Sequence, residues 1–165
     1  MSLPLQKAII AVIGAGDASA KGEKRAYRIG QLLAEQGVVL VCGGLGGVMQ
    51  AASRGCAEAG GEVIGLLPGA DTAEANPYVT IPIVTNMGHA RNVMIAHTAQ
   101  ALIAVEGEYG TLSEMAIGLK LGKPVIQLDS WSQLSAAMVA VTPEQAVTMA
   151  LAAVLEGAGN AERQE

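Results

Sequence analysis

Aromatic residues are nearly absent from this chain of 165 residues, which contains no phenylalanine, one tryptophan and three tyrosines. The hydrophobic core must therefore be filled by alanine, valine, isoleucine, leucine and methionine, while 21 glycines are available for turns. At this length one domain with a substantial core is expected. The composition is typical of an open parallel sheet covered by helices.

Charge is also scarce. Charged residues make up 15% of the chain, the formal net charge is -5, and lysine and arginine do not cluster. A protein of this kind offers no basic face for a nucleic-acid backbone, so we expect no nucleic-acid partner. The apolar runs are as long as strands, not membrane spans, and residues 1–7 do not resemble a targeting signal. We therefore expect a soluble, cytoplasmic protein without a membrane partner.

Metal-binding patterns are missing as well. The two cysteines, Cys42 and Cys56, lack the paired spacing of a zinc site and are too few for a disulfide framework. We expect both to be buried thiols. The two histidines, His89 and His97, lack a partnered carboxylate and are interpreted as one surface and one packed residue. No metal site is predicted.

Short apolar runs alternate with segments of helical periodicity. Strands are expected at 8–13, 38–42, 62–67, 79–84, 101–105 and 125–128, with a possible further strand at 138–141. Helices are expected at 23–36, 48–59, 89–100 (capped by Asn86), 112–120 and 144–156. This order predicts an α/β, single-domain, Rossmann-like, doubly wound and mostly parallel sheet with helices on both faces. The domain is expected to span residues 1–157, followed by a flexible tail at 158–165.

Three glycine-bearing turns follow strands and should meet at the carboxyl edge of the sheet, at 14–17, 43–47 and 107–111. Glycine turns before helices can bind anions, although tight helix–strand packing is an alternative reason for them. The first turn lacks the third glycine of a dinucleotide fingerprint, because Ser19 stands at that position. The second lacks the Lys-Ser/Thr ending of a phosphate loop. We expect no redox nucleotide and no nucleotide triphosphatase.

The third turn is unusual because Glu106, Glu108 and Glu114 surround it. A carboxylate about 5 Å from a phosphate charge costs on the order of 3 kcal/mol at an effective dielectric constant near 20, unless it points away. Thr111 and Glu114 also have the spacing of a capping box, so Glu114 is either a functional residue or a helix cap.

Three blocks of sequence resemble the "Lonely Guy" and lysine-decarboxylase-like Rossmann family, namely Gly-Gly-Leu-Gly-Gly-Val-Met at 43–49, Met-Gly-His-Ala-Arg-Asn at 87–92 and Gly-x-Tyr-Gly-Thr-Leu-x-Glu at 107–114. The resemblance spans most of the chain. It implies that Arg91 and Glu114 would cleave the bond between a base and ribose 5-phosphate, while the glycine-rich turn holds the phosphate. The alternative for Arg91 is a solvated charge on a helix.

The chain departs from the hydrolases of this family at the third turn. The hydrolase turn reads Pro-Gly-Gly-x-Gly-Thr, whereas this one reads Glu-Gly-Glu-Tyr-Gly-Thr at 106–111. With Gly-Ala-Gly at 14–16 and Gly-Thr-Leu-Ser-Glu at 110–114, the chain resembles the molybdenum cofactor carriers of the family. That resemblance implies a homo-oligomer, a dimer or tetramer, that binds and protects molybdopterin-type cofactor without turnover and delivers it to molybdoenzymes. The alternatives are a nucleoside 5′-monophosphate phosphoribohydrolase and a nucleotide-binding sensor.

The ligand's phosphate is expected at the turn 43–47 in preference to the turn 107–111. Lys24, Arg91 and Asn92 can add charge-assisted hydrogen bonds to it. An apolar stripe of Ile117, Gly118 and Leu121 favours either a subunit contact or a deeply buried helix. The candidate ligand-binding residues are Gly14, Gly16, Lys24, Gly43, Gly44, Gly46, Gly47, Arg91, Asn92, Gly107, Glu108, Gly110, Thr111 and Glu114.

Overall fold

The computed structural model describes residues 6–161, with side chains described up to residue 158. Seven strands form one sheet in the order β4-β3-β2-β1-β5-β6-β7, and every neighbouring pair is parallel. The strands are β1 (Ile9–Gly14), β2 (Val39–Cys42), β3 (Val63–Leu67), β4 (Ile81–Val84), β5 (Ala101–Val105), β6 (Val125–Leu128) and β7 (Met138–Val139). The predicted α/β, Rossmann-like fold class is confirmed.

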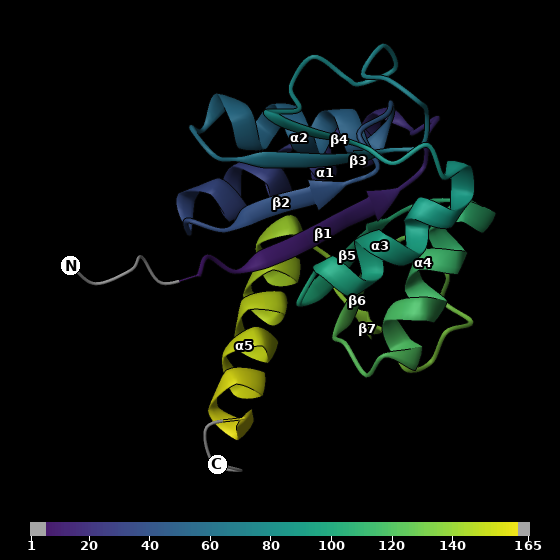
Figure 1. The fold of residues 1–165 in the computed structure, drawn as a ribbon. Coiled ribbons are helices and arrows are strands. Elements are labelled where there is room, and N and C mark those ends of the chain that lie inside the picture. The colour runs from purple at the N-terminus through teal and green to yellow at the C-terminus, as the bar shows by residue number, and fades with distance from the viewer. Residues whose placement is uncertain (1–5, 162–165) are drawn as a thin grey trace.

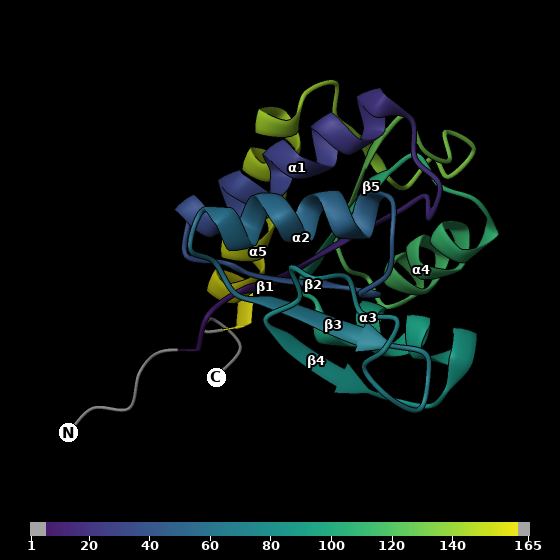
Figure 2. The same cartoon turned by 90° about the horizontal axis from the view of Figure 1, so that it is seen from above.

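Helices cover both faces of the sheet, as Figures 1 and 2 show. One face carries the first, second and last helices, and the other carries the two between them. The helices are α1 (Ala20–Glu35), α2 (Val48–Glu58), α3 (Arg91–Thr98), α4 (Tyr109–Lys120) and α5 (Pro143–Ala161), with a short 3-10 turn η1 (Gly88–Ala90) before α3. None of these described helices combines the length and apolar character needed to cross a membrane.

Aliphatic side chains fill the core on both sides of the sheet. Every residue of β2, β5 and β6 is buried, as expected for strands covered on both faces. Cys42 and Cys56 are free and buried on the side of α1 and α2. Both His89 and His97 are exposed, so the prediction of one packed histidine was wrong.

Several element boundaries differ from the predicted ones. Asn86 does not cap a helix, because its φ is 50° and the chain passes through η1 before α3 begins at Arg91. The first helix begins at Ala20, three residues early, because Ser19 is its N-cap and accepts a hydrogen bond from the Gly22 N–H. The last helix extends to Ala161, so the predicted tail begins inside a helix and its last four residues lie outside the described range.

The predicted apolar stripe on α4 is mostly turned toward the sheet. Gly118 is buried against Leu102 and Val125, Ile117 is half-buried, and Leu121 is 39% exposed. Gly118 and Ile117 therefore pack on the core of this face, while Leu121 remains exposed.

From β1 the chain adds strands β2 to β4 toward one edge of the sheet and then strands β5 to β7 toward the other. The order therefore reverses at β1, which lies between β2 and β5. A parallel sheet opens a crevice at the carboxyl ends of its strands where such a reversal occurs. The first turns after β1, β2 and β5 all reach this crevice, and the fold therefore predicts the ligand site there.

Helices α1 and α2 pack backbone against backbone, which leaves no room for a side chain between them. A Cβ added at Gly55 would lie 1.9 Å from the Tyr27 carbonyl oxygen. We predict that Gly55→Ala lowers the free energy of unfolding by about 1 to 3 kcal/mol, because the two helices must separate to admit the methyl group. Urea denaturation measures the change.

The matched control is Gly157→Ala, because a Cβ there meets no atom within 4 Å. In an exposed helix alanine is more favourable than glycine, so this variant should be as stable as the parent or slightly more stable. Equal stability of the two variants would contradict the close-packing argument.

Candidate functional site

A cleft of about 270 Å³ opens at the carboxyl edge of the sheet, where the turns after β1, β2 and β5 converge. Helices α3 and α4 supply most of its polar side chains, and the turn after β1 supplies most of its backbone wall. Its lining residues are Ile13, Gly14, Ala15, Gly16, Asp17, Gly43, Met49, His89, Arg91, Asn92, Glu108, Gly110, Thr111 and Glu114.

The structure brings nine of the fourteen candidate residues into this cleft, namely Gly14, Gly16, Gly43, Arg91, Asn92, Glu108, Gly110, Thr111 and Glu114. The other five do not line it. Lys24 and Gly47 line a neighbouring groove of about 540 Å³ between α1 and α2. Gly44 and Gly46 lie within the second turn, and Gly107 lies behind Thr111.

Arg91 is the first residue of α3, and only 7% of it is exposed. Its Nε donates a hydrogen bond of 2.8 Å to the Leu66 carbonyl oxygen, and Nη2 donates one of 3.3 Å to the Gly43 carbonyl oxygen. Its Nη1 donates to the Asn92 side-chain oxygen. These bonds fix the guanidinium beneath the second glycine turn and leave one N–H on each terminal nitrogen. Arg91 is therefore no solvated helix charge.

Asn92 connects the two helices that supply the polar side chains. Its Nδ2 donates to the Ser113 hydroxyl at 3.3 Å, and the Ser113 hydroxyl donates to the Gly110 carbonyl oxygen at 2.7 Å. The N-terminal turn of α4 is thereby held against α3. The positions of Arg91 and of the third glycine turn are consequently set by one hydrogen-bonded unit.

Glu114 projects from the second turn of α4 and is 7% exposed. The capping-box interpretation is wrong, because α4 begins at Tyr109 after the N-cap Glu108, which places Thr111 inside the helix. Among the described residues no hydrogen bond is made to the Glu114 carboxyl group. Burial raises the pKa of Glu114 to about 8, although the nearby Arg91 charge lowers it. The cleft therefore contains a carboxyl group that is mostly protonated at neutral pH.

Each of the three converging helices leaves backbone N–H groups without an acceptor among the described residues at its N-terminus, which in α1 are those of Ala20 and Lys21. In the described part of the chain, the N–H groups of Met49 and Gln50 in α2 have no protein acceptor, and neither have those of Gly110 and Thr111 in α4. Neither N-cap, Gly47 or Glu108, makes a side-chain capping bond. Both helix ends can therefore accept an anionic ligand group.

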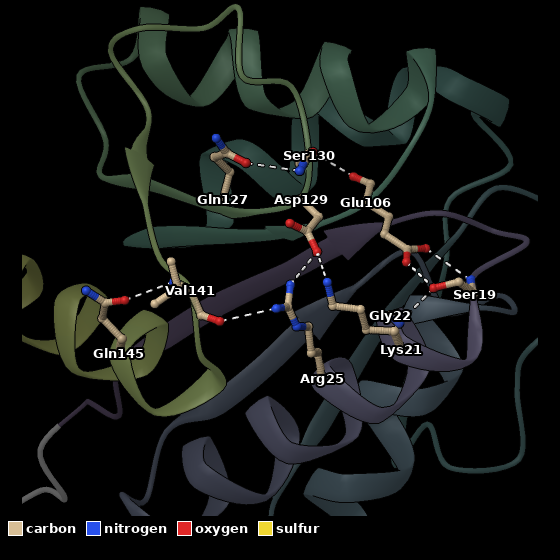
Figure 3. A network of polar contacts seen from close by, with 10 residues as sticks. All are labelled: Ser19, Lys21, Gly22, Arg25, Glu106, Gln127, Asp129, Ser130, Val141 and Gln145. Atoms are coloured by element: carbon tan, nitrogen blue, oxygen red, sulfur yellow. Dashed lines mark hydrogen bonds and ion pairs between the residues drawn. The ribbon is translucent and has the colours of Figure 1, made fainter.

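The two extra carboxylates of the third turn take different directions. Glu108 lines the cleft beside the free N-terminus of α4. Glu106 lies outside the cleft and is hydrogen-bonded to Ser19 at the start of α1, as Figure 3 shows. An anion at α4 would thus lie near the Glu108 carboxylate, whereas an anion at α2 avoids both acids.

Five residues that line the cleft were not among the candidates, namely Ile13, Ala15, Asp17, Met49 and His89. Asp17 ends the first glycine turn, His89 lies two residues before Arg91, and Met49 is the second residue of α2. Each is close in sequence to a residue that was selected, and the expectation that the ligand lies at the strand ends could have found Asp17. His89 lines the cleft only because η1 turns the chain before α3.

The wholly parallel sheet and the cleft at its point of reversal define a protein of the Rossmann-like class. Within that class, the chain belongs to the SLOG cluster4 family, whose model matches residues 7–156. This family is similar to the "Lonely Guy" proteins, so the family resemblance recognised in the sequence is confirmed.

The solved structures and the sequence relative that match this chain carry two different functions. The molybdenum cofactor binding protein of Rippkaea orientalis matches with a TM-score of 0.85 and 38% identity, over 90% of this chain and 98% of that one. The molybdenum cofactor carrier protein of Chlamydomonas reinhardtii matches with a TM-score of 0.82 and 33% identity, over 91% and 99%. A probable cytokinin riboside 5′-monophosphate phosphoribohydrolase of Oryza sativa subsp. japonica is 32% identical over 70% of this chain. The chain spans only 46% of that rice protein.

The raised pKa of Glu114 makes stability depend on pH. The carboxyl group has a pKa near 4.5 in the unfolded chain and about 8 in the folded one. Between these values the unfolded chain releases the proton and the folded chain retains it, so stability falls as pH rises. We predict that Glu114→Gln becomes more stable relative to the parent between pH 5 and pH 9, by about 3 kcal/mol.

Urea unfolding of both proteins at several pH values measures this difference. The control is Glu156→Gln at an exposed position of α5, which should change stability little at any pH. A stability difference between Glu114→Gln and the parent that does not change from pH 5 to pH 9 would contradict the raised pKa.

Proposed function

We propose that this protein binds, protects and carries molybdenum cofactor for delivery to molybdoenzymes, without chemical turnover. The observation that carries the proposal is the position of Glu108, whose side chain borders the cleft at the free N-terminus of α4. In the hydrolase resemblance this turn holds the substrate's phosphate. A carboxylate there costs on the order of 3 kcal/mol for a phosphate about 5 Å away, which disfavours the hydrolase mode of binding.

The solved structures of cofactor-binding proteins add support, because each is matched over nearly its whole length. Molybdopterin consists of a flat pterin, a dithiolene that bears the metal, and a terminal phosphate. We infer that the phosphate binds at the N-terminus of α2, where Met49 and Gln50 offer free N–H groups. Lys24 and Gly47 line the groove on that side, so Lys24 can reach a phosphate bound there.

The pterin and dithiolene would then occupy the cleft. There, protonated Glu114 can donate a hydrogen bond to a ring acceptor, and the remaining N–H groups of Arg91 can donate further ones. No three His, Cys, Asp or Glu side chains in the described part of the chain are grouped as ligands for a metal ion. The molybdenum would therefore be held as cargo, through the organic part of the cofactor.

A homo-oligomer is part of the proposal, and we place its contact on the edge of the sheet at β4. All four residues of β4 are exposed, and three of them, Ile81, Ile83 and Val84, are apolar. Val93 of α3 is also 42% exposed. Exposed apolar side chains on an edge strand favour contact with another subunit or with a recipient molybdoenzyme.

Placing a negative charge in the turn before α2 tests the proposed phosphate position. A Cβ at Gly46 would have the Gly16 carbonyl oxygen as its nearest neighbour, at 3.5 Å, so a side chain fits there. We predict that Gly46→Asp weakens binding of molybdenum cofactor at least tenfold through repulsion of the phosphate. The isosteric, neutral Gly46→Asn should bind within a few-fold of the parent.

Binding is measured by retention of the cofactor on the purified protein and by the rate at which bound cofactor loses the ability to reconstitute an apo-molybdoenzyme. The parent should slow this loss relative to an unrelated protein of similar size. The carrier function is refuted if the parent gives no protection. The α2 position is refuted if the Asp and Asn variants bind equally well.

A phosphoribohydrolase remains the second candidate, because a specific observation favours it. Arg91 and Glu114, which the family resemblance makes catalytic, do lie in one cleft, and their charges interact. An ionised glutamate can stabilise positive charge at an anomeric carbon during cleavage. Since the pKa of Glu114 is about 8, however, little of this group is ionised at neutral pH.

The carrier proposal predicts that AMP and its N6-substituted analogues release no free base above the rate of a blank. The released base is measured by chromatography after long incubation at pH 7 and at pH 9. Base release that increases toward pH 9 and disappears in Glu114→Gln would establish the hydrolase instead, because ionised Glu114 would then be required.

A further inference from the structure

Glu106 supplies a carboxylate to the N-terminus of α1. The residue follows β5 and has a φ of 52°, in the left-handed region that few residues other than glycine adopt. Its carboxylate accepts hydrogen bonds from the Ser19 backbone N–H, at 3.1 Å, and from the Ser19 hydroxyl. The Ser130 hydroxyl donates to the Glu106 carbonyl oxygen at 2.6 Å, so the backbone is fixed on the other side (Figure 3).

A second observation shows that α1 is shaped around this carboxylate. Gly22 lies in the first turn of α1, and a Cβ at this position would lie 2.5 Å from the Glu106 carboxyl carbon. The Gly22 N–H donates to the Ser19 hydroxyl, which in turn contacts Glu106. Glycine is unfavourable inside a helix, so its presence here is explained by the space that the carboxylate needs.

The nearby positive charges do not compensate for the carboxylate. Lys21 and Arg25 point to Asp129, with nitrogen–oxygen distances of 2.8 and 2.6 Å (Figure 3). Lys21 and Arg25 are therefore already paired with an acid, while Lys24, the third cation of the first two turns, lines the groove beside α2. The start of α1 thus presents an occupied N-cap and a fixed negative charge to any approaching ligand.

We propose that Glu106 is a specificity-determining residue, an internal anion that occupies the N-terminus of α1 and excludes ligand phosphate from it. In Rossmann-like proteins the helix after the first strand is where the pyrophosphate of a dinucleotide binds. One unit of negative charge about 5 Å from a phosphate charge weakens binding by on the order of a hundredfold at an effective dielectric constant near 20. Ligands with a pyrophosphate bridge are thereby rejected at α1.

The consequence for the ligand rests on the proposed function. A carrier with this arrangement accepts the form of the cofactor that ends in a phosphate monoester, bound at α2. It rejects a form extended by a nucleotide through a pyrophosphate bridge. The exclusion at α1 itself does not depend on which ligand fills the cleft, so the two can be tested separately.

The test is a titration with inorganic phosphate and with pyrophosphate, followed through backbone amide NMR shifts. The parent should show shifts at Met49 and Gln50 and none that saturate at Ser19 to Gly22. In Glu106→Gly, whose glycine tolerates the positive φ, the amides of 19–22 should respond with an affinity at least tenfold higher than in the parent. Glu106→Gln keeps the shape without the charge and should lie between the two.

Gly22→Ala is the second variant. It keeps the residue Glu106, but the added methyl group pushes the Glu106 carboxylate away from the start of α1. It should also open the start of α1 to pyrophosphate. The proposal is overturned if the parent's amides at 19–22 respond to pyrophosphate as strongly as those of the variants, or if neither folded variant gains affinity. Molybdenum cofactor takes no part in these titrations, so their failure would leave the carrier function to its own test.

Discussion

Every helix that follows a strand of a parallel sheet begins at the same edge, and each brings backbone N–H groups that the helix itself cannot satisfy. How these donors are satisfied determines what the edge can bind. At α1 the N–H groups of Ser19 and Gly22 are satisfied internally, by the Glu106 carboxylate and the Ser19 side chain, while those of Ala20 and Lys21 have no acceptor among the described residues. At α2 and α4 no side chain caps the helix, and free N–H groups border the cleft or the adjoining groove. The α1 end therefore differs from the other two chiefly in the carboxylate that is hydrogen-bonded to its N-cap.

Arg91 depends on this arrangement and also maintains it. Its guanidinium donates to carbonyl oxygens of β3 and of the second glycine turn, so it ties the turn before α2 to the neighbouring strand. Burial lowers the pKa of Arg91, and the proximity of Glu114 opposes this shift. The same burial acts more strongly on Glu114, which has no hydrogen-bond partner among the described residues. One positive group and one mostly neutral acid are the result.

Much of the fold could be predicted from sequence because buried parallel strands are short apolar runs and their turns are rich in glycine. The grouping of Arg91 with Glu114 followed from the family resemblance and from the rule on strand ends. Two features could not be predicted, one because it depends on contacts distant in sequence and one because a local pattern was misleading. The direction of Glu106 depends on Ser19 and Gly22, more than 80 residues earlier. The start of α4 was also hidden, because Thr111 and Glu114 have the spacing of a capping box without forming one.

Hydrolysis and carriage place opposite demands on one carboxyl group. Cleavage at an anomeric carbon needs an ionised glutamate, whereas retention of a phosphate-bearing ligand is favoured by a neutral one. The cleft already contains the side chains of Asp17 and Glu108, so ionising Glu114 would add a further negative charge beside a single buried arginine. Burial of Glu114 avoids this repulsion at neutral pH and leaves a hydrogen-bond donor in its place. A hydrolase that inherited this cleft would have to bind its phosphate less well in order to act, while a carrier loses nothing by keeping Glu114 protonated.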